Sequence, residues 1–234
     1  MQPKSGKPLV TSLLSVVLTL AGLVLVVAAG LNWDESSWAE RVWFVAFVMT
    51  FVIRVPYSAR NRKNKIAESR SGNVEQWLLA AMFLAMMLLP MLHLAGRFFA
   101  FADYHLPDWA AVIGALLQLP YLWLFWRSHA DLGRNWSPGL ELREDHTLVT
   151  GGVYAHMRHP MYAAIWLGAI AQPLLIQNWI AGFLVIPAFA AMCLIRIPRE
   201  EAMMQKRFGD AYDTYMAQSG AIIPSFHRHH SRTL

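Results

Sequence analysis

Arg196 and Glu200 stand four positions apart at the end of a long apolar run, and their types and spacing could do chemistry. Residues at this spacing share one face of a continuing helix. An arginine at a membrane boundary can grip a carboxylate or a phosphate with two hydrogen bonds from its planar fork. The pair could therefore orient an anionic group at the membrane surface, and an ordinary helical ion pair is the alternative. Pro198, between them, could distort the shared face.

A second polar segment, "REDHTLVTGGVYAHMRHPMY" at 143–162, precedes the same apolar run and holds three histidines, two arginines and two tyrosines. Gly151 and Gly152 would let the backbone turn or approach a ligand closely. Pro160 suits the first position of a helix, where a missing N–H costs nothing. Arg158 and His159 would then stand at the mouth of that helix. Taken alone, they could equally be a basic anchor at the membrane surface.

The elements that must position these residues are membrane helices. Hydrophobic residues make up 56% of the 234-residue chain and charged residues 15%, whereas a soluble domain carries about a quarter charged residues. About 20 apolar residues suffice for a helix to cross a bilayer. The apolar runs are 9–31, 42–57, 77–96, 109–126 and 161–195. We therefore expect an all-α, polytopic membrane protein, with the first run retained as a helix.

The last run is too long for one span. As a single helix it would measure about 50 Å, against a hydrocarbon core of about 30 Å. Gln177 and Asn178 form the polar point near its middle, just after Pro173. The sequence thus predicts four single spans, a transmembrane helical hairpin over 160–197, and an amphipathic cytoplasmic helix over 199–217, with a break near Gly209.

Basic residues set the expected orientation. Lys4, Lys7 and the basic segment 60–70 fall on one side if the spans alternate, and the opposite side receives mainly acidic residues. This asymmetry predicts cytoplasmic N- and C-termini. The net charge of +5 is then explained by topology and membrane lipids, so no nucleic-acid partner is expected. The spans over 1–128 form the N-terminal part, 129–226 carries the chemistry, and the histidine-rich tail 227–234 is expected to be disordered, with no metal site.

The polar segments carry a specific pattern. "HTLVTGGVYAHMRHPMY", followed by "RIPREEAMMQKRFGDAYDTY" after the hairpin and preceded by "LGRNWS", resembles the isoprenylcysteine carboxyl methyltransferase family over about 130–224. Two letters depart from the family pattern: Ala164 stands at a glycine position, and "GAIIPSF" lacks the first proline of the closing segment. These departures bear on the substrate more than on the cofactor.

The resemblance implies an integral membrane enzyme that uses S-adenosylmethionine, with a cytoplasmic cofactor pocket built from loops and helix ends. Arg196 and Glu200 would be the catalytic residues, facing the reacting carboxylate and the methyl donor. The residues implied to line the cofactor are His146, Leu148, Val149, Gly151, Tyr154, Arg158, His159, Pro160 and Glu201.

The chemistry of such a site is simple. A carboxylate is already ionised at neutral pH, so its methylation needs no general base. The enzyme must hold two partners in line. The resemblance suggests an acceptor embedded in the bilayer, with a prenylated cysteine as one candidate.

Two other enzyme classes and a non-catalytic role stay open on the sequence. Phospholipid N-methyltransferases have a similar C-terminal design but methylate an amine, for which Arg196 would be poorly placed. Membrane reductases of the sterol reductase type share an R-H-P-x-Y region and bind NADPH. A membrane assembly or transport component would bind neither cofactor.

Overall fold

The computed structural model describes residues 22–61, 66–69, 72–135, 141–143 and 147–225. A helix over Gly22–Leu31 comes first. The long elements are α2 (Trp38–Asn61), α3 (Asn73–Phe83) with the π-helix η1 (Leu84–Leu88) and α4 (Leu89–Gly96), α5 (Asp108–Leu132), α6 (Pro160–Leu175) and α7 (Val185–Phe208). The short elements are β1 (Ile66–Ser69), the 3-10 helices η2 (Ala100–Ala102), η3 (Gly133–Asn135) and η4 (Gly152–Ala155), β2 (Glu141–Arg143), the π-helix η5 (Trp179–Phe183) and α8 (Asp210–Gln218).

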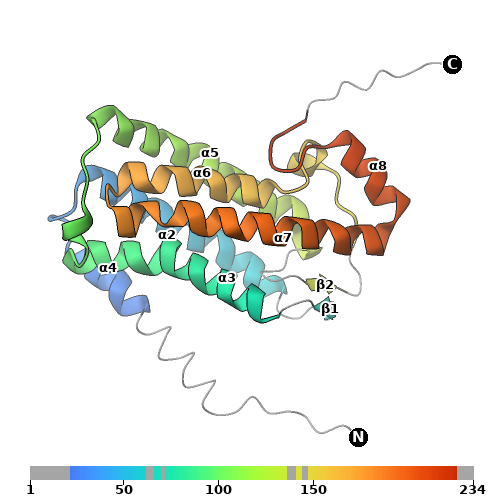
Figure 1. The fold of residues 1–234 in the computed structure, drawn as a ribbon, viewed down its shortest axis with the longest axis horizontal. Coiled ribbons are helices and arrows are strands. Elements are labelled where there is room, and N and C mark those ends of the chain that lie inside the picture. The colour runs from blue at the N-terminus through green and yellow to red at the C-terminus, as the bar shows by residue number, and fades with distance from the viewer. Residues whose placement is uncertain (1–21, 62–65, 70–71, 136–140, 144–146, 226–234) are drawn as a thin grey trace, which may run out of the picture.

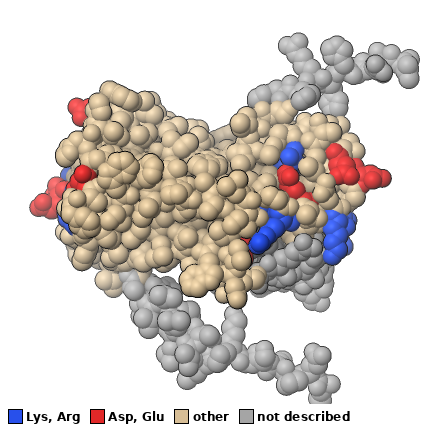
Figure 2. Space-filling view, viewed as in Figure 1, with Lys and Arg blue, Asp and Glu red and all other residues tan. Residues whose placement is uncertain are grey.

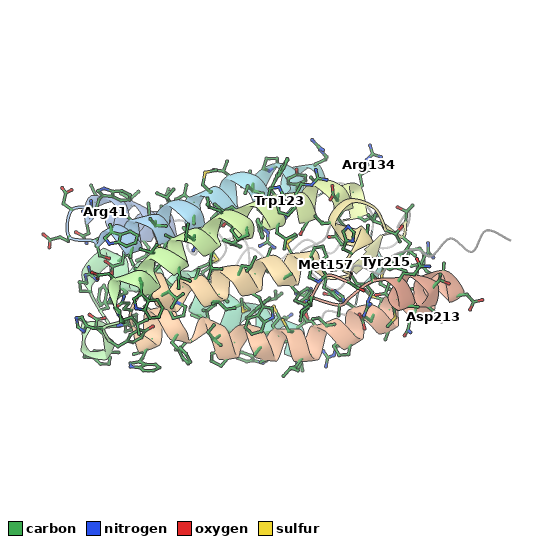
Figure 3. All side chains as sticks on the ribbon, turned by 90° about the horizontal axis from the view of Figure 1, so that it is seen from above. Arg41, Trp123, Arg134, Met157, Asp213 and Tyr215 are labelled. Atoms are coloured by element: carbon green, nitrogen blue, oxygen red, sulfur yellow. The ribbon has the colours of Figure 1, made fainter. Side chains whose placement is uncertain are left out.

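The long helices lie side by side and alternate in direction (Figure 1). At one end, here called the site end, α2, α5 and α7 finish, α3 and α6 begin, and β1, β2 and α8 lie. At the other, the tip end, α4 and α6 finish and the turn between α6 and α7 lies. Figure 3 places Arg134, Met157, Asp213 and Tyr215 at the site end and Arg41 at the tip end. Segments that precede and follow the hairpin in the sequence therefore meet at one end of the bundle.

Four helical stretches are long and apolar enough to cross a membrane: Trp38–Arg60, Asn73–Gly96, Asp108–Asn135 and Trp179–Phe208. Two shorter apolar helices, Gly22–Leu31 and Pro160–Leu175, accompany them. On the face drawn in Figure 2, the charged side chains of the described residues gather at the two ends and leave an uncharged band between them. The chain is a multi-pass membrane protein, and the all-α fold class is confirmed.

The helices match the predicted spans with two differences. The first run, 9–31, is described only from residue 22 onward, so its earlier part lies outside the described residues. β1 and β2, which no pattern predicted, pair antiparallel and place Ile66 opposite Arg143 and Ser69 opposite Glu141. This pair is a small addition at the site end of an otherwise helical protein.

The hairpin turns where its polar residues predicted it would. α6 ends at Leu175, and Asn178 caps η5 by accepting hydrogen bonds from the backbone N–H groups of Ile180 (2.9 Å) and Ala181 (2.7 Å). The Asn178 amide donates to Phe99 O and to Asp103 Oδ1, both at 2.6 Å. The tip therefore reaches the loop between α4 and α5 and is fastened to it, even though α6 has only 16 residues.

Small residues let the helices of the core approach one another. A Cβ added at Gly168 of α6 would meet the ring of Tyr121 on α5 at 3.2 Å. Tyr121, Phe125 and Ala164 are buried together where α5 faces α6. On the other side of the hairpin, Phe189 of α7 is buried with residues of α3, η1 and α6. The hairpin thus packs against both halves of the bundle.

The helix predicted over 199–217 differs at its start, because its first part is continuous with the second arm of the hairpin. α7 continues past Pro198 to Phe208, and a separate α8 begins at Asp210. Gly209 separates them with a positive φ of 53°, at the position where a break was predicted. Pro198 does not end the helix. Glu200 and Glu201 are therefore carried on the same rigid helix as Arg196.

We expect Asn178→Ala to lower the stability of the fold by about 2–4 kcal/mol, because three or four hydrogen bonds worth about 1 kcal/mol each are lost and buried backbone groups are left unpaired. The measurement is the midpoint of thermal unfolding in detergent. The matched control is Asn73→Ala, at the exposed first residue of α3. Equal midpoints for the two variants would contradict the fastening role of Asn178.

Candidate functional site

Arg196 lies between two carboxylates at the site end. It is buried on α7, with Nη2 3.1 Å from Glu200 Oε1 on the same helix and Nη1 3.3 Å from Glu75 Oε1 on α3. Within the described residues, Arg196 Nε and both Glu75 oxygens lack a hydrogen-bond partner. The two carboxylates therefore balance the positive charge of the guanidinium, and its Nε can still donate a hydrogen bond.

Glu200 also joins α7 to α6. Tyr162, two residues into α6, donates a hydrogen bond from its hydroxyl to Glu200 Oε1 at 2.6 Å. His159 Nδ1 lies 3.6 Å from the other oxygen, Oε2. Glu200 is thus held from three sides by Arg196, Tyr162 and His159. A carboxylate fixed in this way can in turn fix the orientation of Arg196.

Glu201 points to a different set of partners. Its Oε1 accepts a hydrogen bond from Arg158 Nε at 2.8 Å and lies 3.1 Å from His159 Nε2. Arg158 Nη1 also donates to Met216 O (3.2 Å) and Ser219 O (2.5 Å), at the end of α8. A cation is favoured there by the partial negative charge of a helix C-terminus. Arg158 therefore ties the hairpin mouth, α7 and α8 together.

The backbone before the hairpin is bound to the segment after α8. Arg158 N donates to Gly220 O at 2.8 Å, and His159 N donates to Ala221 O at 2.9 Å. His156 O accepts from Gly220 N (3.1 Å) and from Ser225 N (2.9 Å). Residues 220–225, which belong to the "GAIIPSF" stretch that departs from the family pattern, are thus hydrogen-bonded to the loop that leads into the hairpin.

Two buried tyrosines fix the loop that leads into the hairpin. Tyr215 of α8 donates to Tyr154 O at 2.6 Å, and Tyr154 donates to Ser128 O on α5 at 3.2 Å. Burial raises the pKa of Tyr215 to about 12, and burial likewise raises the pKa of Tyr154. Both hydroxyls therefore stay protonated and act as donors at neutral pH. The ring of Tyr154 is buried and its hydroxyl is hydrogen-bonded to α5, so Tyr154 holds the loop before the hairpin in position.

The two adjacent glycines have different roles. Gly152 has a positive φ of 62°, and a Cβ there would lie 2.2 Å from an Asp131 carboxylate oxygen. Asp131 is held in place because it accepts from Val153 N at 2.9 Å and pairs with Arg127 at 2.6 Å. Gly151 has an extended backbone, and no atom of the described residues lies within 4 Å of the position of its Cβ. The fold requires glycine at 152, whereas at 151 there is open space in front of the backbone.

The structure brings together most of the residues singled out from the sequence. Arg158, His159, Arg196, Glu200 and Glu201 form one connected network. Pro160 is the buried first residue of α6, as its type predicted.

Three other predicted residues lie outside that network. Leu148 and Val149 are half-buried in the extended segment before Gly151. His146 lies outside the described residues.

Sequence reasoning missed Glu75 and Asp131. Glu75 sits in the first turn of α3, where an acidic residue reads as an ordinary helix start, so no signal linked it to Arg196. The only sequence signal that pointed to Asp131 was indirect: a glycine at 152 indicates that some other group lies close to the backbone there. Among the described residues, no group of three or more His, Cys, Asp or Glu side chains is arranged to hold a metal.

We expect Gly152→Ala to lower stability by at least about 1–2 kcal/mol, since the left-handed backbone disfavours a Cβ and the Asp131 contact must break. Gly151→Ala should leave stability unchanged or raise it slightly, because its extended backbone accepts any residue. Thermal unfolding midpoints of the two variants provide the measurement. A larger loss for Gly151→Ala than for Gly152→Ala would contradict this assignment.

Comparison with known proteins places the site within a known family pattern. Residues 112–206 match the sequence model of the isoprenylcysteine carboxyl methyltransferase (ICMT) family. The protein-S-isoprenylcysteine O-methyltransferase of Schizosaccharomyces pombe is 35% identical over 81 residues, which are 35% of this chain and 34% of the relative. The enzyme of the same name from Tribolium castaneum is 38% identical over 88 residues, 36% of this chain and 30% of the relative.

The matched segment is thus about a third of the length of these relatives. A solved structure described as the eukaryotic intramembrane Ras methyltransferase ICMT aligns with 93% of this chain and 87% of its own, at 17% identity and a TM-score of 0.41. Arg158, His159, Arg196, Glu200 and Glu201 all fall inside the segment that matches the family model. The resemblance to the isoprenylcysteine carboxyl methyltransferase family is confirmed, and it extends over residues 112–206.

Proposed function

We propose that this protein transfers a methyl group from S-adenosylmethionine to the carboxylate of a lipophilic acceptor at the membrane surface. The observation that carries the proposal is the position of Arg196. Its guanidinium is buried partway along a membrane-spanning helix, is oriented by Glu200, and keeps an unpartnered Nε within the described part of the chain. An arginine fork in this position suits a carboxylate arriving from the bilayer.

The open space in front of Gly151 supports a cofactor site. The backbone of 147–151 can be approached closely there, and no side chain of the described residues fills that space. Both contacts of Glu201 use Oε1, which leaves Oε2 for an ammonium or hydroxyl group of the donor. Leu148 and Val149 would offer apolar contacts, and His146 would belong to the same loop. Arg158, His159, Pro160 and Tyr154 would hold this pocket in shape.

The reaction asks little more of the chain than positioning. When bound, S-adenosylmethionine supplies a methyl group on a sulfonium; a carboxylate oxygen forms a bond to that methyl carbon, and the carbon–sulfur bond breaks with its electron pair going to sulfur. Arg196 would hold the carboxylate in line, and holding two partners in line can lower the barrier by several kcal/mol. Glu200, Glu75 and Tyr162 would keep the guanidinium oriented. No residue needs to remove a proton.

The same proposal places the site end in the cytoplasm. By their places on the elements, Arg60, Arg134, Arg199, Lys206 and Arg207 lie at the site end, whereas acidic residues such as Asp34, Glu35 and Asp108 lie at the tip end. This distribution follows the positive-inside rule. With alternating spans, both termini would then be cytoplasmic. The acceptor's lipid part would stay in the bilayer, and a prenylated cysteine, the substrate in the names of the relatives, is the first acceptor to test.

Binding of S-adenosylmethionine to the detergent-purified protein is the first test, with NADPH in parallel. We expect saturable S-adenosylmethionine binding that Gly151→Leu weakens at least tenfold, because the added side chain occupies the open space. The matched control is Gly30→Leu, in the helix Gly22–Leu31. No atom of the described residues lies within 4 Å of the position of a Cβ there. Binding of NADPH alone would replace this proposal with a reductase, and binding of neither would point to a non-catalytic role.

A second test addresses the acceptor. We expect Arg196→Lys to lower kcat/KM for a farnesylcysteine carboxylate at least about 100-fold, because lysine keeps the charge but loses the fork. The dissociation constant of S-adenosylmethionine should change less than about threefold. Arg199→Lys, exposed on the same helix, should have no such effect. Methylation of phosphatidylethanolamine but not of the carboxyl acceptor would show that the nucleophile is an amine.

A further inference from the structure

A cavity of about 260 Å³ lies between α2, η1, α5 and α6, inside the membrane-spanning part of the bundle. This is close to the lower end of ligand pockets, which begin at about 300 Å³. Phe47, Phe51, Met86 and Phe125 form much of its apolar wall. The cavity is therefore large enough for part of a lipid chain.

The cavity is elongated along the helices. It is lined by α2 from Trp43 to Arg54, a separation of about 16 Å at 1.5 Å per residue. Arg54 lies in the half of α2 nearer the site end, the end of the bundle toward which Arg196 lies on α7. A chain lying in the cavity would thus point one end toward the guanidinium proposed to orient the acceptor carboxylate.

Two of the polar groups that line the cavity are satisfied within the protein. Thr50 bonds to Ala46 O at 2.8 Å and to the Tyr121 hydroxyl at 3.0 Å. The Gln172 amide donates to Ala85 O and Ala181 O, both at 2.9 Å, and accepts from Trp43 Nε1 at 3.3 Å. These side chains fasten helices to one another, so they need no ligand to explain them.

Gln118 is different. It lines the same cavity and is only 5% exposed, yet its Oε1 has no hydrogen-bond partner in the described part of the chain. An unpaired amide oxygen in a membrane interior is costly, since lipid chains cannot satisfy it and water is absent there. Polar groups in this position usually pair across helices. Gln118 faces a cavity where a ligand could supply the missing partner.

We propose that this cavity holds the lipid part of the acceptor, and that this part carries a hydroxyl group that hydrogen-bonds to Gln118. A hydroxyl both donates and accepts, so it satisfies the amide in either orientation. α2 and α5 both run from the tip end to the site end, and the hydrogen bond between Thr50 and Tyr121 puts these two residues at the same level. Arg54 lies one turn closer to the site end than Thr50, and Gln118 lies three residues closer to the tip end than Tyr121. The hydroxyl therefore belongs about 10 Å from the Arg54 end. The inference rests on the proposed function for the identity of the ligand as acceptor.

Hydroxylated fatty acids test this inference directly. The probes are octadecanoate, 10-hydroxyoctadecanoate and 2-hydroxyoctadecanoate, and their dissociation constants are measured on the detergent-purified full chain. We expect the 10-hydroxy acid to bind about fivefold or more tighter than octadecanoate, the effect of one net hydrogen bond. The 2-hydroxy acid should have no advantage, because its hydroxyl lies beside the carboxylate.

Gln118→Leu should remove the preference for the 10-hydroxy acid and leave S-adenosylmethionine binding unchanged. The variant should fold, since it deletes an unpaired polar group without a change of shape. Gln218→Leu, exposed at the end of α8, is the matched control and should keep the preference. Equal binding of the three acids, or a preference that survives Gln118→Leu, would overturn the inference. Intact preference without S-adenosylmethionine binding would instead overturn the proposed function and leave the hydroxyl-binding cavity in place.

Discussion

The site end depends on the contact that the partly buried Glu201 makes with Arg158 and His159. Charges in a poorly solvated position are stable only when they are paired, and removing one partner of such a pair typically costs about 3–5 kcal/mol. Glu201 compensates two residues at the mouth of the hairpin, and Arg158 also engages the carbonyls that end α8. Arg158 thereby joins α7 and α8 to the entry to α6, beside the backbone hydrogen bonds that tie residues 156–159 to residues 220–225.

The two consecutive glutamates of α7 contact different parts of the site because of helix geometry. Neighbouring residues on a helix point about 100° apart, so Glu200 and Glu201 face largely different partners. Glu200 turns toward Arg196 and Tyr162, on the side of the bundle interior, and Glu201 turns toward Arg158 and α8. One carboxylate thus orients the proposed acceptor-binding arginine, while the next holds the walls of the proposed cofactor pocket. His159 contacts both and couples the two functions.

Sequence reasoning succeeded where a single physical rule was decisive. The hairpin followed from the length of an uncharged run set against the thickness of a bilayer, and its turn followed from Gln177 and Asn178. The break at Gly209 followed from residue type. The rule failed where pairing is long-range: Glu75 meets Arg196 across more than a hundred residues of sequence, and β1 and β2 are short polar segments without alternation. Pro198 was expected to be able to distort the face shared by Arg196 and Glu200, but α7 continues through it and the two side chains meet at 3.1 Å.

The same reasoning explains why a distant turn matters for the chemistry. The first arm of the hairpin, from Pro160 to Leu175, is about 24 Å long at 1.5 Å per residue, and the second arm runs from the turn through η5 and α7 to Arg196. Asn178 fixes the turn between them and fastens it to the loop between α4 and α5. Because both arms are measured from one fixed point, Tyr162 arrives opposite Glu200 with little freedom to slide. A slip of one residue would move the guanidinium of Arg196 by about 1.5 Å along the bundle and by 100° around the helix, which is enough to separate it from both carboxylates.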